Sequence, residues 1–333
     1  MKNILLTIIL ALIASSCSTF IPKFISKKEA KLCTELACME ADKYFWDNLH
    51  AGNYDSIPQI LEKLKQSYYK NPGDYKLAAH IGFTHAWAIS ENHKLRNESA
   101  QIIDHATLAK QYFKEAFDLS PEKDWRLYGF YASFLMAEGT IHGDDKQVVK
   151  GYFEMKKAVK KYPEFNLFTK AYSIMNGGRR GEAIEDLWKN LDKCACEKVD
   201  RKNLDYRKYD HLKDVESKKS TCWNTWIAPH NLEGFFLIFG DLLLQEKDRE
   251  GALMLYRNAT YVDNFDNWHY KGKLLQRISK LENAIVESKL KAGIYVHDYD
   301  NCMVCHQENS MKESPDNVHT LRPNMEVSVH LFK

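Results

Sequence analysis

The stretch "AKQYFKEAFDLSP", residues 109–121, decides the fold class of this chain. It places Ala109, Phe113 and Ala116 four and three residues apart, on one face of an α-helix, and it ends at Pro121. Two alanines on a helix face let a neighbouring helix approach closely, and the aromatic side chain fills the gap between the pair. The stretch therefore predicts one member of a closely packed helix pair.

The same spacing of small, large and small residues recurs along the chain, as expected of a repeat protein. Two further copies lie in "GYFEMKKAVKKYP" (151–163) and "ALMLYRNATYVDN" (252–264). Their matching residues are Gly151, Met155 and Ala158 in the first and Ala252, Tyr256 and Ala259 in the second. Less regular copies lie around residues 60–72 and 183–190.

Each of these helices should have a partner upstream in the sequence. "FFLIFGDLL" (235–243) carries Phe236, Phe239, Gly240 and Leu243 at helical spacing, and "LAAHIGFTHAW" (77–87) and "WRLYGFYASFL" (125–135) are similar. Together, the two helix patterns resemble those of the tetratricopeptide repeat. The resemblance covers about residues 40–266, with insertions expected at 90–103 and 142–149. It implies an all-α fold, an irregular solenoid of helical hairpins, whose surface binds protein partners.

Three segments differ from the repeats. Residues near 193–222 are rich in charge and poor in large apolar residues, which predicts an exposed loop. Cys194 and Cys196 precede this loop and Cys222 follows it, so a disulfide across it is expected in an oxidising compartment. Residues 267–293 read as one capping helix with a stripe of Leu274, Ile278, Leu281 and Ile285. Residues 294–333 form a small irregular C-terminal segment.

The N-terminal residues predict export. Residues 1–16 combine a lysine, a short apolar run and small residues, which is typical of a signal peptide. The run ends in "IASSC", which resembles the lipobox of bacterial lipoproteins. The resemblance implies a lipid on Cys17, a linker over 17–39 and a location on the periplasmic face of a membrane.

The C-terminal segment contains "NCMVCHQ", residues 301–307, with Cys302, Cys305 and His306 in the spacing C-x-x-C-H. This motif is how c-type cytochromes attach haem: two thiols bind the vinyl groups and the histidine coordinates iron. The resemblance implies one haem c on these three residues, with Tyr295, Tyr299 and the aromatic residues near Trp268 contributing to the pocket. Met311 is the nearest candidate for a sixth ligand, followed by His319, Met325 and His330.

Two other chemistries use the same residues. Cys302 and Cys305 could instead form a disulfide, or bind zinc together with His306, His297 or His319. The remaining cysteines do not decide between these, because Cys33, Cys38, Cys194, Cys196 and Cys222 are an odd number. If Cys33 and Cys38 both lay on a helix, their spacing of five would put them on different faces and argue against a bond between them.

Other function classes lack support in the sequence. There are 47 basic and 45 acidic residues, so no net charge favours nucleic acid. No phosphate-binding glycine loop, serine-hydrolase elbow or zinc-protease motif occurs, so no enzyme is expected. Two functions remain: a haem-bearing electron-transfer protein, and an interaction scaffold whose C-x-x-C-H is only structural.

Overall fold

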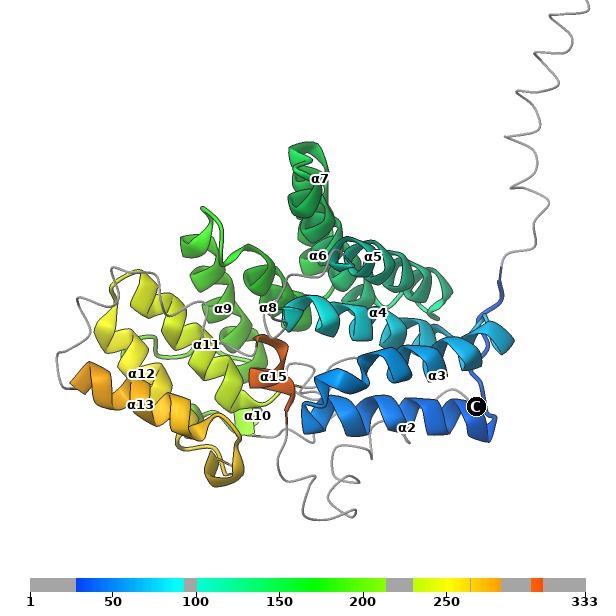
Figure 1. Ribbon diagram of the computed structural model, residues 1–333. Helices are drawn as coiled ribbons and strands as arrows, with labels where there is room; N and C mark the ends of the chain where they lie inside the picture. The colour runs from blue at the N-terminus through cyan, green and yellow to red at the C-terminus, as the bar shows by residue number, and fades with distance from the viewer. Residues whose placement is uncertain (1–27, 93–100, 214–229, 264, 283–300, 308–333) are drawn as a thin grey trace, which may run out of the picture.

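The computed structural model describes residues 28–92, 101–213, 230–263, 265–282 and 301–307, the last with side chains from Val304 onward. Within these ranges the chain forms thirteen α-helices and three short 3₁₀ helices, arranged along an arc (Figure 1). The 3₁₀ helices are η1 (Tyr54–Ser56), η3 (Tyr206–Lys208) and η4 (Phe265–Asn267).

The helices follow one another with short connections. Their bounds are α2 Leu36–Ala51, α3 Ile57–Lys70, α4 Tyr75–Ser90, α5 Ile102–Leu119, α6 Trp125–His142, α7 Asp145–Lys161, α8 Pro163–Ile174, α9 Arg180–Ala195, α10 Asp210–Lys213, α11 Leu232–Gln245, α12 Arg249–Ala259, α13 Lys271–Glu282 and α15 Asn301–His306.

Neighbouring helices pack as hairpins. The pairs α2/α3, α4/α5, α6/α7, α8/α9 and α11/α12 are each in contact, and successive pairs are joined by α3 with α4, α5 with α6 and α7 with α8. Next-neighbour contacts of α2 with α4, α6 with α8 and α9 with α11 stack the hairpins on one another. The prediction of an all-α, irregular array of helical hairpins is therefore confirmed.

Small residues on one helix of a hairpin lie against large residues on the other, as the spacing predicts. A Cβ atom placed on Gly82 of α4 would lie 3.3 Å from the ring of Phe113 on α5. In the last hairpin, a Cβ atom on Gly240 of α11 would lie 2.3 Å from the ring of Tyr256 on α12. The alanines of the pattern, including Ala259, are fully buried. Close approach of the helices therefore depends on these small side chains.

Polar side chains start several of the helices. The carboxylate of Asp74 accepts hydrogen bonds from the backbone N–H groups of Lys76 and Leu77, at 2.8 and 3.1 Å. Asp124, Asp144, Asn231 and Asp248 cap α6, α7, α11 and α12 in the same manner. These caps satisfy N–H groups that have no partner inside the helix.

One of the two insertions expected between repeats is absent. Residues 142–149 form a tight turn and the first turn of α7: Gly143 takes the left-handed conformation (φ 66°) and Asp144 caps the next helix. The prediction of an insertion here was wrong because α6 and α7 are long helices, with 18 and 17 residues, and their ends contain the polar residues. The other expected insertion, 90–103, lies partly outside the described residues.

The predicted exposed loop near 193–222 is also wrong for its first part. Val199, Leu204, Tyr206 and Leu212 are buried. The side chain of Asn258 on α12 accepts a hydrogen bond from Tyr206 N–H at 2.8 Å and donates one to the Leu204 carbonyl at 2.8 Å. The segment is thus packed against the last hairpin. Residues 214–222 lie outside the described residues.

One cysteine pair differs from the expectation. Cys33 and Cys38 form a disulfide. Cys33 precedes α2 and only Cys38 lies on it, so the argument from helix faces does not apply. Cys194 is also disulfide-bonded and Cys196 is a free, exposed thiol. The expected partner of Cys194, Cys222, lies outside the described residues.

The predicted capping helix is present as α13 over the part that the structure describes. Leu274 and Leu281 are buried in the core and Ile278 is half-buried against it, as the stripe predicts. Ile285 and the rest of 283–293 lie outside the described residues. Among the helices described, none is long and apolar enough to cross a membrane.

Candidate functional site

The C-x-x-C-H motif lies on the short helix α15, in the middle of the arc. α15 contacts α2 and α4 from the first hairpins and α11 from the last (Figure 1). Val304, Cys305 and His306 are all buried. The motif is therefore enclosed by the helical array, although it belongs to the C-terminal segment of the sequence.

Backbone groups of α15 are held by the start of α11 and by Trp268. The N–H of Asn231 donates to the carbonyl of Cys305 at 2.8 Å, and the indole N–H of Trp268 donates to the carbonyl of Val304 at 3.3 Å. A Cβ atom on Gly234 would lie 2.4 Å from the Val304 carbonyl oxygen. Only glycine at this position lets α11 approach α15 so closely.

Gln307, directly after the motif, connects the two ends of the array. Its side-chain amide donates to the carbonyl of Ala51 at the end of α2 at 3.4 Å, and it accepts from the hydroxyl of Tyr270 at 3.3 Å. Tyr270 immediately precedes α13. Gln307 therefore links the end of α2 to the start of α13.

The imidazole of His306 is 7% exposed and lies between two other rings. Phe83 of α4 meets it edge to face, with 5.2 Å between ring centroids. His230, two residues before α11, lies on it with 5.2 Å between centroids and 40° between planes. The motif histidine therefore has a second imidazole as a direct neighbour.

Aromatic side chains from further hairpins surround this pair. The ring of His230 lies 4.5 Å from that of Phe168 and 6.2 Å from that of Phe165, both on α8. Phe83 in turn contacts Phe130 of α6. An apolar, aromatic surrounding of this kind excludes water and favours a flat, apolar ligand.

The structure brings some of the predicted site residues together and does not describe others. Cys305 and His306 are both buried, and Trp268 lies beside them through its hydrogen bond to the Val304 carbonyl. Cys302 lies on α15, but its side chain is outside the described residues. Also outside them are Cys17, Tyr295, His297, Tyr299, Met311, His319, Met325 and His330. His230 was missed, because "APHN" before α11 has no spacing relation to the motif.

The donor types at α15 are those that a c-type haem uses, while the rings of Phe83 and His230 are in direct contact with that of His306. A buried imidazole and a cysteine of the same turn are present, a second imidazole is adjacent, and the neighbouring rings are aromatic. In the part of the chain that the structure describes, no group of three or more His, Cys, Asp or Glu residues is placed to hold a metal ion. The other zinc ligands considered, His297, His319 and the side chain of Cys302, lie outside that part.

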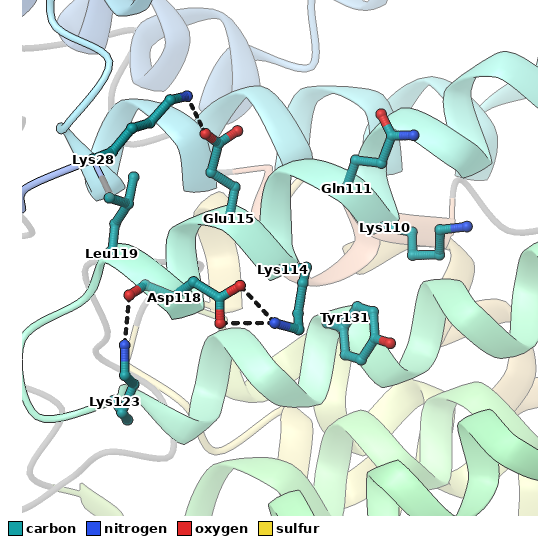
Figure 2. Close-up of a pocket in the computed structure, with 9 residues that line it drawn as sticks. All are labelled: Lys28, Lys110, Gln111, Lys114, Glu115, Asp118, Leu119, Lys123 and Tyr131. Atoms are coloured by element: carbon teal, nitrogen blue, oxygen red, sulfur yellow. Dashed lines mark hydrogen bonds and ion pairs between the residues drawn. The ribbon is translucent and has the colours of Figure 1, made fainter. Parts of the chain in front are cut away.

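A surface pocket of about 830 Å³ lies elsewhere, on α5 and α6 (Figure 2). It is rich in lysine, and each lysine is held by an acceptor of the protein: Lys28 by Glu115, Lys110 by Glu138, Lys114 by Asp118, and Lys123 by the Asp118 carbonyl. The positive charges are thus largely compensated within the chain. We assign no ligand to this pocket.

A buried histidine of α4, His85, pairs with a half-buried one of α5, His105. The Nδ1 atoms of His85 and His105 lie 2.7 Å apart, and the ring of Tyr112 stacks on His85. Burial, the nearby Lys65 ammonium and His105 lower the pKa of His85 to about 3. Burial and Lys65 also lower the pKa of His105. Both rings are therefore neutral near pH 7, and one donates a hydrogen bond to the other.

A buried ion pair attaches the capping helix. Nε of Arg277 on α13 donates to the carboxylate of Asp241 on α11 at 2.9 Å, and the Tyr256 hydroxyl donates to the same oxygen. Burial raises the pKa of Asp241 to about 6, although Arg277 and Tyr256 oppose this shift. The pair is structural and lies apart from the motif.

Comparison with known proteins gives no further assignment: no protein-family model matches the chain, and no curated protein is significantly similar to it.

Proposed function

We propose that this chain is an exported lipoprotein of tetratricopeptide-like repeats that carries one haem c and transfers electrons to a protein partner bound on its helical repeats. The observation that carries the proposal is the position of His306. It is buried in the centre of the array, between Phe83 and a second imidazole, His230.

The residues of the motif have defined roles in this proposal. The thiols of Cys302 and Cys305 would hold the haem through thioether bonds, each formed by adding S–H across one vinyl double bond, which needs both thiols reduced and no further oxidant. His306 would be the protein's ligand to the iron, and the aromatic rings around it would exclude water. The bound haem supplies a one-electron carrier.

The location follows from the N-terminal sequence. Attachment of haem to C-x-x-C-H takes place outside the cytoplasm, where the signal peptide 1–16 would direct the chain. A lipid on Cys17 would keep the protein at the membrane surface, with the repeats available to a partner.

A second candidate function, a scaffold without haem, is favoured by one observation. The hydrogen bonds of Val304, Cys305 and Gln307 hold the two ends of the array together. In this alternative Cys302 and Cys305 form a disulfide, and α15 is a structural clamp within an interaction scaffold.

The two functions differ in covalent haem content. Protein made in a host competent for cytochrome c maturation should retain a haem stain through denaturing electrophoresis, because thioether bonds survive unfolding. Cys302→Ser with Cys305→Ser should abolish the stain, and Cys196→Ser, which changes an exposed thiol outside the motif, should not. Wild-type protein without a Soret band, with Cys302 and Cys305 joined in the mass spectrum, would establish the scaffold instead.

A further inference from the structure

Helix α7 has one buried side and one exposed, lysine-rich side. Gly151, Met155 and Ala158 are buried. The opposite side carries two apolar residues and six lysines, all exposed: Val149, Phe153, Lys146, Lys150, Lys156, Lys157, Lys160 and Lys161. At about 100° per residue these positions fall within about 140° of the helix circumference, with Phe153 near the middle. They form one continuous surface, the basic face of α7.

Few acidic side chains balance this face. α7 contains one aspartate and one glutamate against its six lysines. Among the ion pairs of the described residues, the one that involves a lysine of α7 joins Lys157 to Glu154 at 2.8 Å. Lys156 and Lys161 lie over aromatic rings, contacts that leave their charge in place. The lysines of the pocket on α5 and α6 differ, because each is held by an acceptor.

Two apolar side chains project from the basic face. Val149 is 53% exposed, and Phe153, one turn further along the helix, is 56% exposed. Lysines are attracted to an anionic lipid surface, and an aromatic side chain gains free energy by entering the layer between headgroups and acyl chains. Lysines around an exposed phenylalanine are therefore typical of a helix that lies on a membrane surface.

The position of α7 suits a flat partner. The helix packs on α6 and α8 and lies on the outer side of the arc, where it projects beyond its neighbours (Figure 1). Helical solenoids bind proteins mainly on their concave side, and here α15 lies on that side. With 17 residues, α7 is about 25 Å long. Its lysines are spread over this length, so they can contact one plane together.

The lipid proposed for Cys17 is within reach of the same plane. The described chain begins at Lys28, eleven residues after Cys17, so the two are at most about 40 Å apart. Lys28 binds Glu115 of α5. α5 packs on α6, the partner of α7, and packed helix axes lie about 10 Å apart. A membrane that holds the lipid is thus close enough for α7 to contact it.

We infer that the basic face of α7 lies against an anionic phospholipid surface and so orients the array on the membrane. The inference rests on the membrane location proposed above and is independent of the haem. The contact is electrostatic and weakens with salt, so the lipid remains the anchor. The bilayer contacts the outer side of the arc, and the side that holds α15 is turned away from it.

The test measures binding of the full chain to vesicles by sedimentation, in a Cys17→Ser background so that no attached lipid contributes. The chain should bind vesicles of phosphatidylcholine mixed with phosphatidylglycerol, and not vesicles of phosphatidylcholine alone. Binding should weaken as the salt concentration rises. The triple variant Lys146→Gln, Lys150→Gln and Lys160→Gln should bind about 100-fold more weakly, because each lysine near such a surface contributes about fivefold.

The matched control removes the same charge from exposed lysines of α3, α9 and η3: Lys70→Gln, Lys193→Gln and Lys208→Gln. It should bind nearly as well as the unchanged chain. Phe153→Ser should weaken binding about 10-fold and keep its salt dependence, because it removes apolar burial and no charge. Circular dichroism should show the same helix content in all variants.

Three results would overturn the inference: no preference for the anionic vesicles, an equal loss in both triple variants, or binding to soluble polyglutamate through α7 without binding to vesicles. The last would assign the face to an acidic protein. The proposed function is tested separately by the haem stain. A chain without haem that binds anionic vesicles through α7 would lose that function and keep this inference, and a haem protein that ignores the vesicles would do the reverse.

Discussion

The ring of Tyr256 occupies the space that a side chain on Gly240 would need. A Cβ atom on Gly240 would lie 2.3 Å from one ring carbon and 2.6 Å from the next, which no real pair of carbon atoms tolerates. The contact holds α11 and α12 together in the last hairpin. It is the clearest case of the small–large complementarity that the repeated sequence pattern predicts.

Gly240→Ala should therefore destabilise the protein by about 1–3 kcal/mol, the usual cost of overpacking a core. An alanine in a helix is otherwise better than glycine by about 1 kcal/mol. Gly181→Ala is the matched control, because nothing lies within 4 Å of its Cβ position on α9, and it should be neutral or stabilising. Unfolding in urea measures the free energy of unfolding of both variants. If Gly240→Ala is as stable as Gly181→Ala, the close contact between Gly240 and Tyr256 is contradicted.

Arg277→Met should destabilise the protein more than Gly240→Ala does. The expected loss is about 3–5 kcal/mol, because the Asp241 carboxylate is left buried without its cation. Arg277 and Asp241 are 5% and 3% exposed, so water cannot replace the lost partner. Arg277→Met combined with Asp241→Leu should recover part of the loss, since no charge remains buried. Free energies of unfolding in urea would measure the single and double variants. If the loss in the double variant equals the sum of the two single losses, the two residues are not coupled.

The buried His85, paired with His105, predicts a loss of stability in mild acid. The pKa of His85 is about 3 in the folded protein and near 6.5 when unfolded. Below pH 6.5 the unfolded chain therefore binds a proton that the folded protein resists, and stability falls as the pH drops from 6.5 towards 3. The slope from this residue is at most about 1.4 kcal/mol per pH unit.

His85→Phe should reduce that slope, because phenylalanine keeps an aromatic ring beside Tyr112 and does not titrate. Thermal melts at pH 7 and pH 5 would measure the difference, with His142→Phe as the exposed control. An unchanged slope in His85→Phe would place the acid sensitivity elsewhere.

The anchoring of the protein can be tested at Cys17. Cys17→Ser should release the protein from membranes into the soluble periplasmic fraction, because serine cannot take the thioether-linked lipid of a lipoprotein. Fractionation followed by a carbonate wash measures this. A variant that stays on the membrane would show that residues 14–17 are no lipidation signal.

Local patterns in the sequence were enough to predict most of the hairpins. Ala109, Phe113 and Ala116 lie within two turns of one helix, and their spacing alone indicates the face that packs. The motif at Cys305 and His306 is equally local. These features could be found because each is encoded by residues close together in the chain.

Features that depend on distant residues were not accessible in this way. Val199 and Leu204 lie in a stretch full of charge, and their segment is folded in by Asn258, a residue of the last hairpin. His230 reaches His306 only because α11 and α15 pack together. Cys33 pairs with Cys38 because α2 begins between them. Each of these three features depends on where a helix begins or ends, or on which distant helix a segment packs against.

The bond between Gln307 and Ala51 has a consequence for how the chain folds. An open array of hairpins can grow from any unit, because each unit touches only its neighbours. Here two residues 256 positions apart must meet. Closing so long a loop is entropically costly and slow, and Gln307 leaves the ribosome after every hairpin. Refolding should end with a distinct slow phase in which α15 packs into the preformed arc. Once it is in place, the two ends of the array that Gln307 joins should resist local unfolding together.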